Sequence, residues 1–235
     1  MPEDKSDKRD EVSFARLIIR GVIFHLLLIA ILFISAGRLN YWQGWVFVAS
    51  NVVLILVAFL LFVDKKELVR ERMRPGPGTK WWDKVFYVFF IPTFLAIMIV
   101  ASLDAGRFGW TSRLPAFLYM IGYVAYVFSN AVTFWAMWTN RFFSSVVRIQ
   151  TERGHEVVQD GPYRFVRHPG YVAGIILAIS ISLVLGSLWA LIPAGLFVIQ
   201  LLIRTYLEDR TLHEELSGYD DYAAKVRYRL LPGIW

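Results

Sequence analysis

The sequence has no cysteine, which excludes disulfide bonds, thiolate nucleophiles and cysteine-ligated metals. It lacks GxGxxG, Walker and GxSxG motifs, which argues against a Rossmann-type nucleotide site and against a serine hydrolase. Charged residues are few, at 19% of the chain, whereas 57% of the residues are hydrophobic, above the roughly 45–50% of soluble domains. The composition therefore predicts an integral membrane protein. No metal site is predicted, because no HExxH or similar spacing occurs among the four histidines, His25, His155, His168 and His213.

Several apolar runs are long enough, at about 20 residues, for an α-helix to cross a bilayer. Four of them are Leu17 to Ala36, Trp42 to Val63, Val85 to Leu103 and Leu114 to Trp138. A fifth run, Tyr171 to Ile203, has 33 residues, which is too long for one span and slightly short for two. Gly186 and Ser187 near its middle, with Pro193 soon after, favour a tight hairpin of two short helices. The predicted fold is all-α, a polytopic membrane bundle of about five to six transmembrane helices.

The distribution of lysine and arginine predicts the orientation of these spans. With six spans, 22 of the 25 basic residues fall in both termini and two large loops, and only Arg38, Arg107 and Arg113 fall in the alternate loops. By the positive-inside rule, both termini and both large loops are expected in the cytoplasm of a multi-pass protein. Five spans would place the basic C-terminal tail outside and break this pattern. The formal charge of +6 is thus mainly a topology signal, and membrane lipids are expected partners rather than nucleic acid.

Three regions are expected along the chain. Residues 1–13 carry mixed charge without apolar content and are predicted to be a disordered N-terminal segment. Residues 14–140 hold the N-terminal transmembrane helices. Residues 141–235 hold most of the chemically informative side chains, in a cytoplasmic loop, the helical hairpin and a tail that we expect to form an amphipathic interfacial helix.

The segment GPYRFVRHPGY, residues 161–171, places arginines, a histidine and tyrosines against the start of the long apolar run. Polar groups at a membrane boundary are costly and are usually functional. Pro169 favours a helix start beside His168. Arg204 and Glu208, spaced i, i+4 after the run, share one helix face. If the hairpin forms, both clusters meet in one cytoplasm-facing cofactor pocket. Taken separately, the arginines could bind lipid phosphates, His168 could cap the helix, and Arg204 and Glu208 could form a surface salt bridge.

At these residues the sequence resembles the isoprenylcysteine carboxyl methyltransferase (ICMT) family and its phospholipid methyltransferase relatives, which are integral-membrane enzymes that use S-adenosylmethionine. The resemblance covers Gln150 to Trp235 and is weak before it. It rests on GHEVVQDGPYRFVRHPGY, on the Arg204 and Glu208 pair, and on GYDDY, RYRLLP and the final tryptophan. The chain departs from the family at Asp209, where a second glutamate is common, and at the SGY of residues 217–219, where FG often stands.

The resemblance implies roles for individual residues and a reaction. Arg204 is implied to handle the carboxylate of the substrate, and Arg204, Glu208 and His168 are the candidate catalytic residues. The implied reaction is methyl transfer to a lipophilic acceptor that enters from the bilayer, either an isoprenylcysteine-type carboxylate or a lipid head group. For an amine acceptor, His168 or Glu208 would serve as the base. The residues implied to hold S-adenosylmethionine are Gln150, His155, Glu156, Val157, Val158, Tyr163, His168, Pro169, Gly170, Tyr171 and Glu208.

Two other function classes remain open. Membrane sterol reductases share a similar C-terminal arrangement but bind NADPH, and Arg148, Arg153 and Arg164 could contact its 2′-phosphate. The arginine-rich cytoplasmic face is also compatible with a non-catalytic lipid-binding membrane protein. Titration with S-adenosylmethionine against NADPH separates the three classes.

Overall fold

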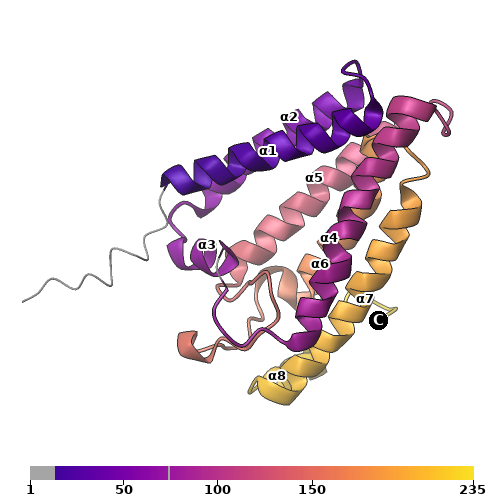
Figure 1. Cartoon of the computed structure of the whole chain (residues 1–235). Helices are drawn as coiled ribbons and strands as arrows, with labels where there is room; N and C mark the ends of the chain where they lie inside the picture. Colours follow the sequence, from indigo (N-terminus) through magenta and orange to yellow (C-terminus); the bar gives the residue numbers. More distant parts are fainter. Residues whose placement is uncertain (1–13, 74) are drawn as a thin grey trace, which may run out of the picture.

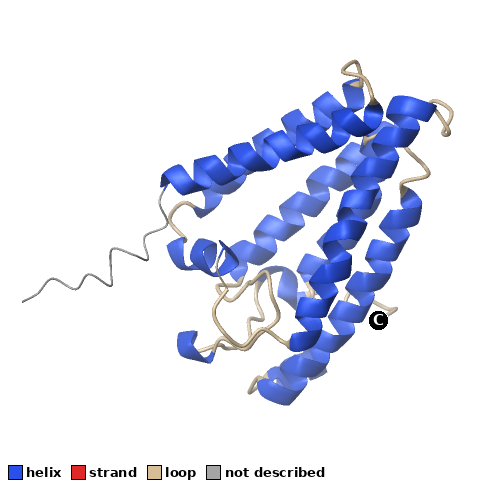
Figure 2. Ribbon diagram, viewed as in Figure 1, coloured by secondary structure: helices blue, strands red, loops and turns tan. Residues whose placement is uncertain are grey.

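A computed structural model describes residues 14–73 and 75–235, so the predicted disordered segment 1–13 lies outside the described residues. All regular structure in the described part is helical, as Figure 2 shows, which confirms the predicted all-α class. The main helices are α1 (Phe14–Ala36), α2 (Trp42–Phe62), α3 (Lys66–Met73), α4 (Trp81–Ala101), α5 (Ala116–Thr139), α6 (Pro169–Val184), α7 (Leu191–Glu215) and α8 (Tyr219–Lys225). A π-helical turn, η2 (Ser102–Phe108), prolongs α4, and two 3₁₀ turns, η3 (Thr151–Arg153) and η4 (Gly161–Arg164), lie in the loop before α6.

Five helices in the described part are long and apolar enough to cross a membrane, so the protein is a multi-pass membrane protein. They are Ile18–Ala36, Trp42–Phe62, Trp81–Phe108, Ala116–Thr139 and Leu191–Glu215, and α6 is a shorter apolar helix. Their outer faces expose large apolar side chains, among them Ile34, Leu60, Val88, Met120 and Ile192. Such a continuous apolar exterior is unsuited to water and suits contact with lipid chains.

The predicted hairpin is present. α6 ends at Val184 and α7 begins at Leu191, and the chain reverses through Gly186, whose φ of +82° favours glycine. A Cβ on Gly186 would also lie 2.7 Å from the hydroxyl oxygen of Tyr119. The expectation of two short helices is wrong for the second one, because α7 has 25 residues and continues past Ile203 to Glu215. Its last turns are polar in sequence; Asp209 on one face is buried by the loop and tail described below, whereas Arg210 and Glu214 are exposed.

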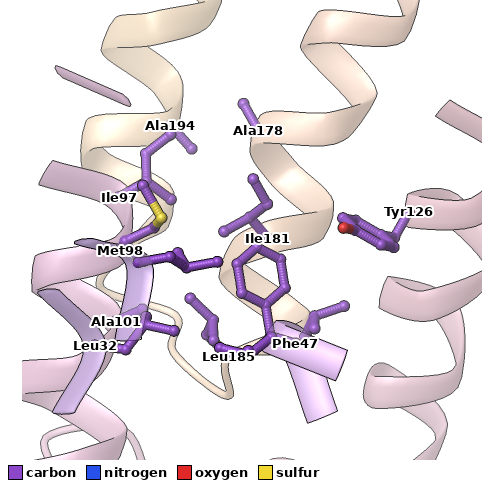
Figure 3. Close-up of a cluster of buried hydrophobic side chains, with 14 of the residues drawn as sticks. Leu32, Phe47, Ile97, Met98, Ala101, Tyr126, Ala178, Ile181, Leu185 and Ala194 are labelled. Atoms are coloured by element: carbon purple, nitrogen blue, oxygen red, sulfur yellow. The ribbon is translucent and has the colours of Figure 1, made fainter. Parts of the chain in front are cut away.

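The helices form a bundle in which α4 and α7 run side by side and α6 packs on both α5 and α7 (Figure 1). The apolar core joins α1, α2, α4, α5, α6 and α7, with the side chains of Ile97, Ile181 and Leu185 almost fully buried (Figure 3). Gly122 permits the close approach of α5 to α6, because a Cβ there would lie 2.8 Å from the Cβ of Leu183. The core thus fixes α6 against its neighbours and sets where its first turn points.

The two ends of the bundle differ. At the end with the α6–α7 turn, the buried carboxylate of Asp104 accepts hydrogen bonds from the Thr111 hydroxyl at 2.5 Å and the Ser187 hydroxyl at 2.6 Å. This contact ties the loop before α5 to the hairpin turn. The opposite end, here called the site end, carries α3, the loop of residues 140–168 and α8 (Figure 1). Which end faces the cytoplasm stays a prediction from the charge distribution.

The tail folds onto the protein at the site end. α8 has seven residues, and its Tyr219 and Tyr222 are buried against Tyr163 and Leu216. An irregular segment follows it to Trp235. The expectation of one amphipathic interfacial helix is therefore wrong, because the helix ends at Lys225 and its two tyrosines are buried against the rest of the protein.

Candidate functional site

The candidate site lies where α6 begins, beside the polar half of α7. Tyr171, in the first turn of α6, donates a hydrogen bond from its hydroxyl to the carboxylate of Glu208. The ring of Tyr171 stacks on that of His168, with centroids 5.7 Å apart and an interplanar angle of 15°. Pro169 occupies the first helical position, as its fixed φ favours. The hairpin therefore brings the two sequence clusters together.

Glu208 is partly buried, and in the described part of the chain its carboxylate pairs with no lysine, arginine or histidine. The alternative of a surface salt bridge between Arg204 and Glu208 is not seen, although both residues lie on α7. A partly buried carboxylate without a cation is costly unless a ligand supplies the positive charge. Glu208 is thus a residue that could hold the positive end of a cofactor.

Arg204 is buried and its charge is already paired. Its Nε lies 2.9 Å from Oδ1 of Asp83 on α4, and its Nη2 donates to the carbonyl oxygen of Ser145 at 2.8 Å. Asp83 is fully buried and also accepts a hydrogen bond from the backbone N–H of Val147 at 2.8 Å. The guanidinium carbon of Arg204 lies 4.6, 5.3 and 5.5 Å from three ring centroids, those of Phe86, Tyr87 and Tyr171. These contacts fix the side chain tightly within the site.

Asp209 is the hub that joins the hairpin to the loop and tail. It is fully buried and accepts two hydrogen bonds from Arg167, at 2.8 and 3.0 Å. It also accepts from the hydroxyl of Tyr219 at 2.8 Å and from Nε of Arg229 at 2.6 Å. Nε2 of His168 lies 3.1 Å from Oδ1 of the same carboxylate. His168 is therefore held by Asp209 on one side and by the ring of Tyr171 on the other.

Arg167 clamps the tail against the entry of α6. Its Nη1 donates to the carbonyl oxygens of Val226 and Arg227, both at 2.9 Å. The backbone N–H groups of Arg167 and His168 donate to the carbonyl oxygens of Tyr228 and Arg229 at 2.9 and 3.0 Å. Burial alone would lower the pKa of Arg167, but the hydrogen bonds and the charge of the Asp209 carboxylate outweigh it and raise the pKa. The clamp stays charged at any physiological pH.

The first part of the implied cofactor segment is occupied by contacts within the loop. The side chain of Gln150 is almost fully buried, donates to the carbonyl oxygen of Phe142 at 2.7 Å and accepts from Arg153. Nδ1 of His155 accepts a hydrogen bond from the backbone N–H of Gln150 at 3.3 Å. Burial, together with nearby arginine charges, lowers the pKa of His155 to about 4, so its ring is neutral at pH 7. The structure thus places Gln150 and His155 as a brace that shapes the loop.

The remaining implied residues lie on both sides of η4. Glu156 is exposed and lies 3.2 Å from Arg141, whereas Val157 and Val158 pack against the tyrosine cluster of the tail. Tyr163 is buried, its hydroxyl accepts from Asn140 at 3.2 Å, and burial raises its pKa. Gly170 is in tight contact, because a Cβ there would lie 3.0 Å from the ring of Phe143.

A surface cavity of about 320 Å³ opens to one side of this site, between the start of α3 and the end of α5. It contains none of the residues that the resemblance assigns to the cofactor. It is lined by Asp64, Lys65, Lys66, Glu67, Leu68, Met137, Arg141 and Arg153.

Sequence reasoning missed the partners that organise the site. Asp83 directly follows two tryptophans at the start of an apolar run, and an acid at that position was a signal of function that the predicted span, beginning at Val85, left out. Glu71 on α3 forms a buried ion pair with Arg148, with Oε2 2.9 Å from Nη2. No sequence signal links Glu71 to Arg148, because 77 residues separate them.

Comparison with known proteins agrees with the motifs. The model of the family described as isoprenylcysteine carboxyl methyltransferase (ICMT) matches residues 120–214. Two curated rice proteins, from Oryza sativa subsp. indica and subsp. japonica, are each named probable protein-S-isoprenylcysteine O-methyltransferase. Each is 28% identical to this chain over 118 residues, which is 47% of the chain. The aligned part spans 59% of the length of these relatives. Over residues 120–214 the chain is thus similar to the ICMT family, in agreement with the motifs of residues 150–171 and with Arg204 and Glu208.

Proposed function

We propose that the protein is an integral-membrane methyltransferase that uses S-adenosylmethionine and methylates a lipophilic carboxylate of the isoprenylcysteine type. The observation that carries the proposal is the contact between Tyr171 and Glu208, which unites the HPGY motif with the acid of α7. The family match covers both residues. Residues 141–235 would then form the methyltransferase core, supported by the helices of residues 14–140.

The residues present fit the cofactor. Glu208 lacks a cation among the described residues, so its carboxylate can bind the α-ammonium group of S-adenosylmethionine. The stacked rings of His168 and Tyr171 offer an aromatic wall beside it. The loop from Gln150 to Val158 and η4 would complete the pocket. When bound, S-adenosylmethionine would supply an activated methyl group to the acceptor oxygen, and the electron pair of the broken carbon–sulfur bond would stay on sulfur.

The side chains of the protein would mainly orient the reactants and exclude water, because a carboxylate nucleophile is already ionised. Asp209 holds His168 in place, and His168 in turn holds the ring of Tyr171. Arg167 keeps the tail closed over this end of the hairpin. An amine acceptor would need a free base. The two candidates, His168 and Glu208, already hold hydrogen bonds within the site, which favours a carboxylate acceptor.

The acceptor would reach the site from the bilayer. α7 exposes Ile199, Ile203 and Tyr206 on one face, and Arg204 on its other face points into the site. An isoprenoid chain lying along this exposed face would bring a polar end toward the reacting group. The charge distribution further supports a cytoplasmic site end. Because the chain has no cysteine, labelling of single introduced cysteines at the site end in intact cells tests that orientation, and labelling by an impermeant reagent from outside would contradict it.

Calorimetric titration of the folded, detergent-solubilised protein with S-adenosylmethionine tests the proposal. We expect binding by the wild type and at least tenfold weaker binding by Glu208→Gln, which corresponds to about 1.4 kcal/mol or more. Glu214→Gln is the matched control, because Glu214 lies on the same helix but is exposed and paired with Arg210. The proposal is falsified if the wild type shows no affinity for the cofactor. Labelled-methyl transfer into membrane extracts then identifies the head group of the product.

The alternative of an NADPH-dependent reductase loses most of its specific support. Arg148 is engaged by Glu71 and Glu152, and Arg164 by Asp160. Arg153 donates to Gln150 and to a backbone carbonyl. Arg148 and Arg153 are therefore engaged within the loop, whereas the exposed Arg164 makes only a weak surface pair. A parallel titration with NADPH separates the classes, and a lipid-binding protein without catalysis would bind neither compound.

A further inference from the structure

Arg72, near the end of α3, carries a positive charge next to the candidate site, and no role has yet been given to it. In the described part of the chain its guanidinium pairs with no carboxylate. The neighbouring Glu71 is not available, because its oxygens contact Arg148 at 2.9 and 3.0 Å and the Ser144 hydroxyl at 2.9 Å. That buried pair anchors α3 to the loop and so fixes where Arg72 lies. A partly buried arginine without an acceptor needs an explanation.

Ser145 links Arg72 to Arg204. The hydroxyl of Ser145 donates to the backbone carbonyl of Arg72 at 3.3 Å. The carbonyl oxygen of Ser145 accepts from Nη2 of Arg204 at 2.8 Å and also accepts from the hydroxyl of Tyr87. The guanidinium carbon of Arg72 lies 5.1 Å from the ring centroid of Phe143, the ring that also packs on Gly170 at the start of α6. Arg72 therefore borders the same site as Arg204.

The two arginines differ in their electrostatic state. The charge of Arg204 is compensated by Asp83, whereas that of Arg72 is not. Despite an opposing effect of Tyr87, burial and the positive charge of Arg204 lower the pKa of Arg72. Both effects penalise the charged form, so a bound anion would relieve them. The site thus has two charges without a partner among the described residues, the negative Glu208 on α7 and the positive Arg72 on α3.

We propose that Arg72 is the residue that binds the carboxylate of the methyl acceptor, and that the Arg204–Asp83 pair positions the aromatic wall next to it. The inference rests on the proposed function. It differs from the family resemblance, which assigns the carboxylate contact to Arg204. A guanidinium is suited to this task, since it can donate two parallel hydrogen bonds to a carboxylate. Glu208 and Arg72 then recognise the oppositely charged groups of the two reactants.

The test compares two probes in the full-length, detergent-solubilised protein: an S-farnesyl cysteine with a free carboxylate, and the same molecule as its carboxamide. Binding of each is measured by calorimetry with the wild type, Arg72→Gln and Arg70→Gln. Arg70 is the matched control, because it lies on the same helix and is exposed. We expect Arg72→Gln to weaken binding of the carboxylate about 30-fold, to leave the carboxamide within about twofold, and to leave the affinity for S-adenosylmethionine unchanged. Arg70→Gln should match the wild type in all three titrations.

The outcomes separate this inference from the proposed function. A wild type that binds no S-adenosylmethionine overturns both. A wild type that binds the cofactor and methylates the carboxylate probe, with Arg72→Gln equal to it in carboxylate affinity, overturns the role of Arg72 alone. If Arg72→Gln does not fold, the same titrations are made with Arg72→Lys, which keeps the positive charge but cannot donate two parallel hydrogen bonds to a carboxylate. A selective loss of carboxylate affinity of about three- to tenfold supports the proposal, and equal affinity refutes it.

Discussion

Replacing Asp209 with alanine should detach the tail and strongly destabilise the protein. Arg167 and Asp209 are 6% and 1% exposed at their side chains, and removing one member of such a buried pair costs about 3–5 kcal/mol. Arg229 is 28% exposed, so its pair with Asp209 adds only about 1 kcal/mol. A loss of about 4 kcal/mol is large against the roughly 5–15 kcal/mol that stabilises a typical domain. At about 2–4 °C per kcal/mol, the melting temperature should fall by roughly 10 °C.

Thermal unfolding in detergent measures this fall, and limited trypsin digestion follows the tail, which carries Lys225, Arg227 and Arg229. Faster cleavage there is expected, because Arg167 no longer has the carboxylate that aims it at the tail carbonyls. Asp220→Ala is the control: Asp220 also contacts a histidine, but its side chain is 81% exposed. It should change the melting temperature by no more than about 2 °C. The reasoning is refuted if Asp209→Ala melts within that range of the wild type and is cleaved no faster.

Two further predictions concern the loop and the bundle. The pKa of His155 is lowered from 6.5 to about 4, mainly by burial, so the unfolded chain binds a proton that the folded loop excludes. The contribution of neutral His155 to the free energy of unfolding should therefore be complete above about pH 6.5 and fall toward pH 4, by up to about 1.4 kcal/mol per pH unit. In melting temperatures measured against pH, His155→Gln should show a smaller fall over this range than the wild type. Curves of the two proteins that run parallel would contradict this prediction. Gly122→Ala should lower the free energy of unfolding by about 1–3 kcal/mol, because its Cβ would meet Leu183 at 2.8 Å. Gly195→Ala is the control and should be neutral, because nothing lies within 4 Å of its Cβ. Equal effects of the two variants in thermal unfolding would argue against close packing of α5 and α6.

The hairpin was predictable because its signals are local. A run of 33 residues exceeds one bilayer crossing, and Gly186 can adopt the positive φ that the turn needs. The positions of Pro169 at a helix start and of Glu208 near Tyr171 follow from that hairpin. The end of α7 was not predictable in the same way. Its polar turns read as leaving the membrane, yet Asp209 on one face of them is buried by groups that lie far away in the sequence.

Asp209 shows why one sequence does not disclose such contacts. A carboxylate next to Glu208 reads as a variation of a family pair, and its partners Arg167, Tyr219 and Arg229 each have a plausible local role at the membrane surface. Only the folded tail shows that all three converge on one oxygen pair. The same holds for Asp83 and Arg204, which meet across 121 residues because α4 packs along α7.

The charged residues proposed to bind the cofactor and the methyl acceptor lie in different parts of the chain. This separation gives a reason why relatives could share a cofactor and differ in acceptor. Glu208 lies inside the segment that the family model matches, residues 120–214, whereas Arg72 and Asp83 lie outside it. If the matched proteins bind one cofactor, the residues that hold it are expected in the segment that they share. An acceptor that differs between members is best recognised by residues that can change independently. On this reasoning, the N-terminal helices would set the acceptor through α3 and α4, and the hairpin would set the reaction.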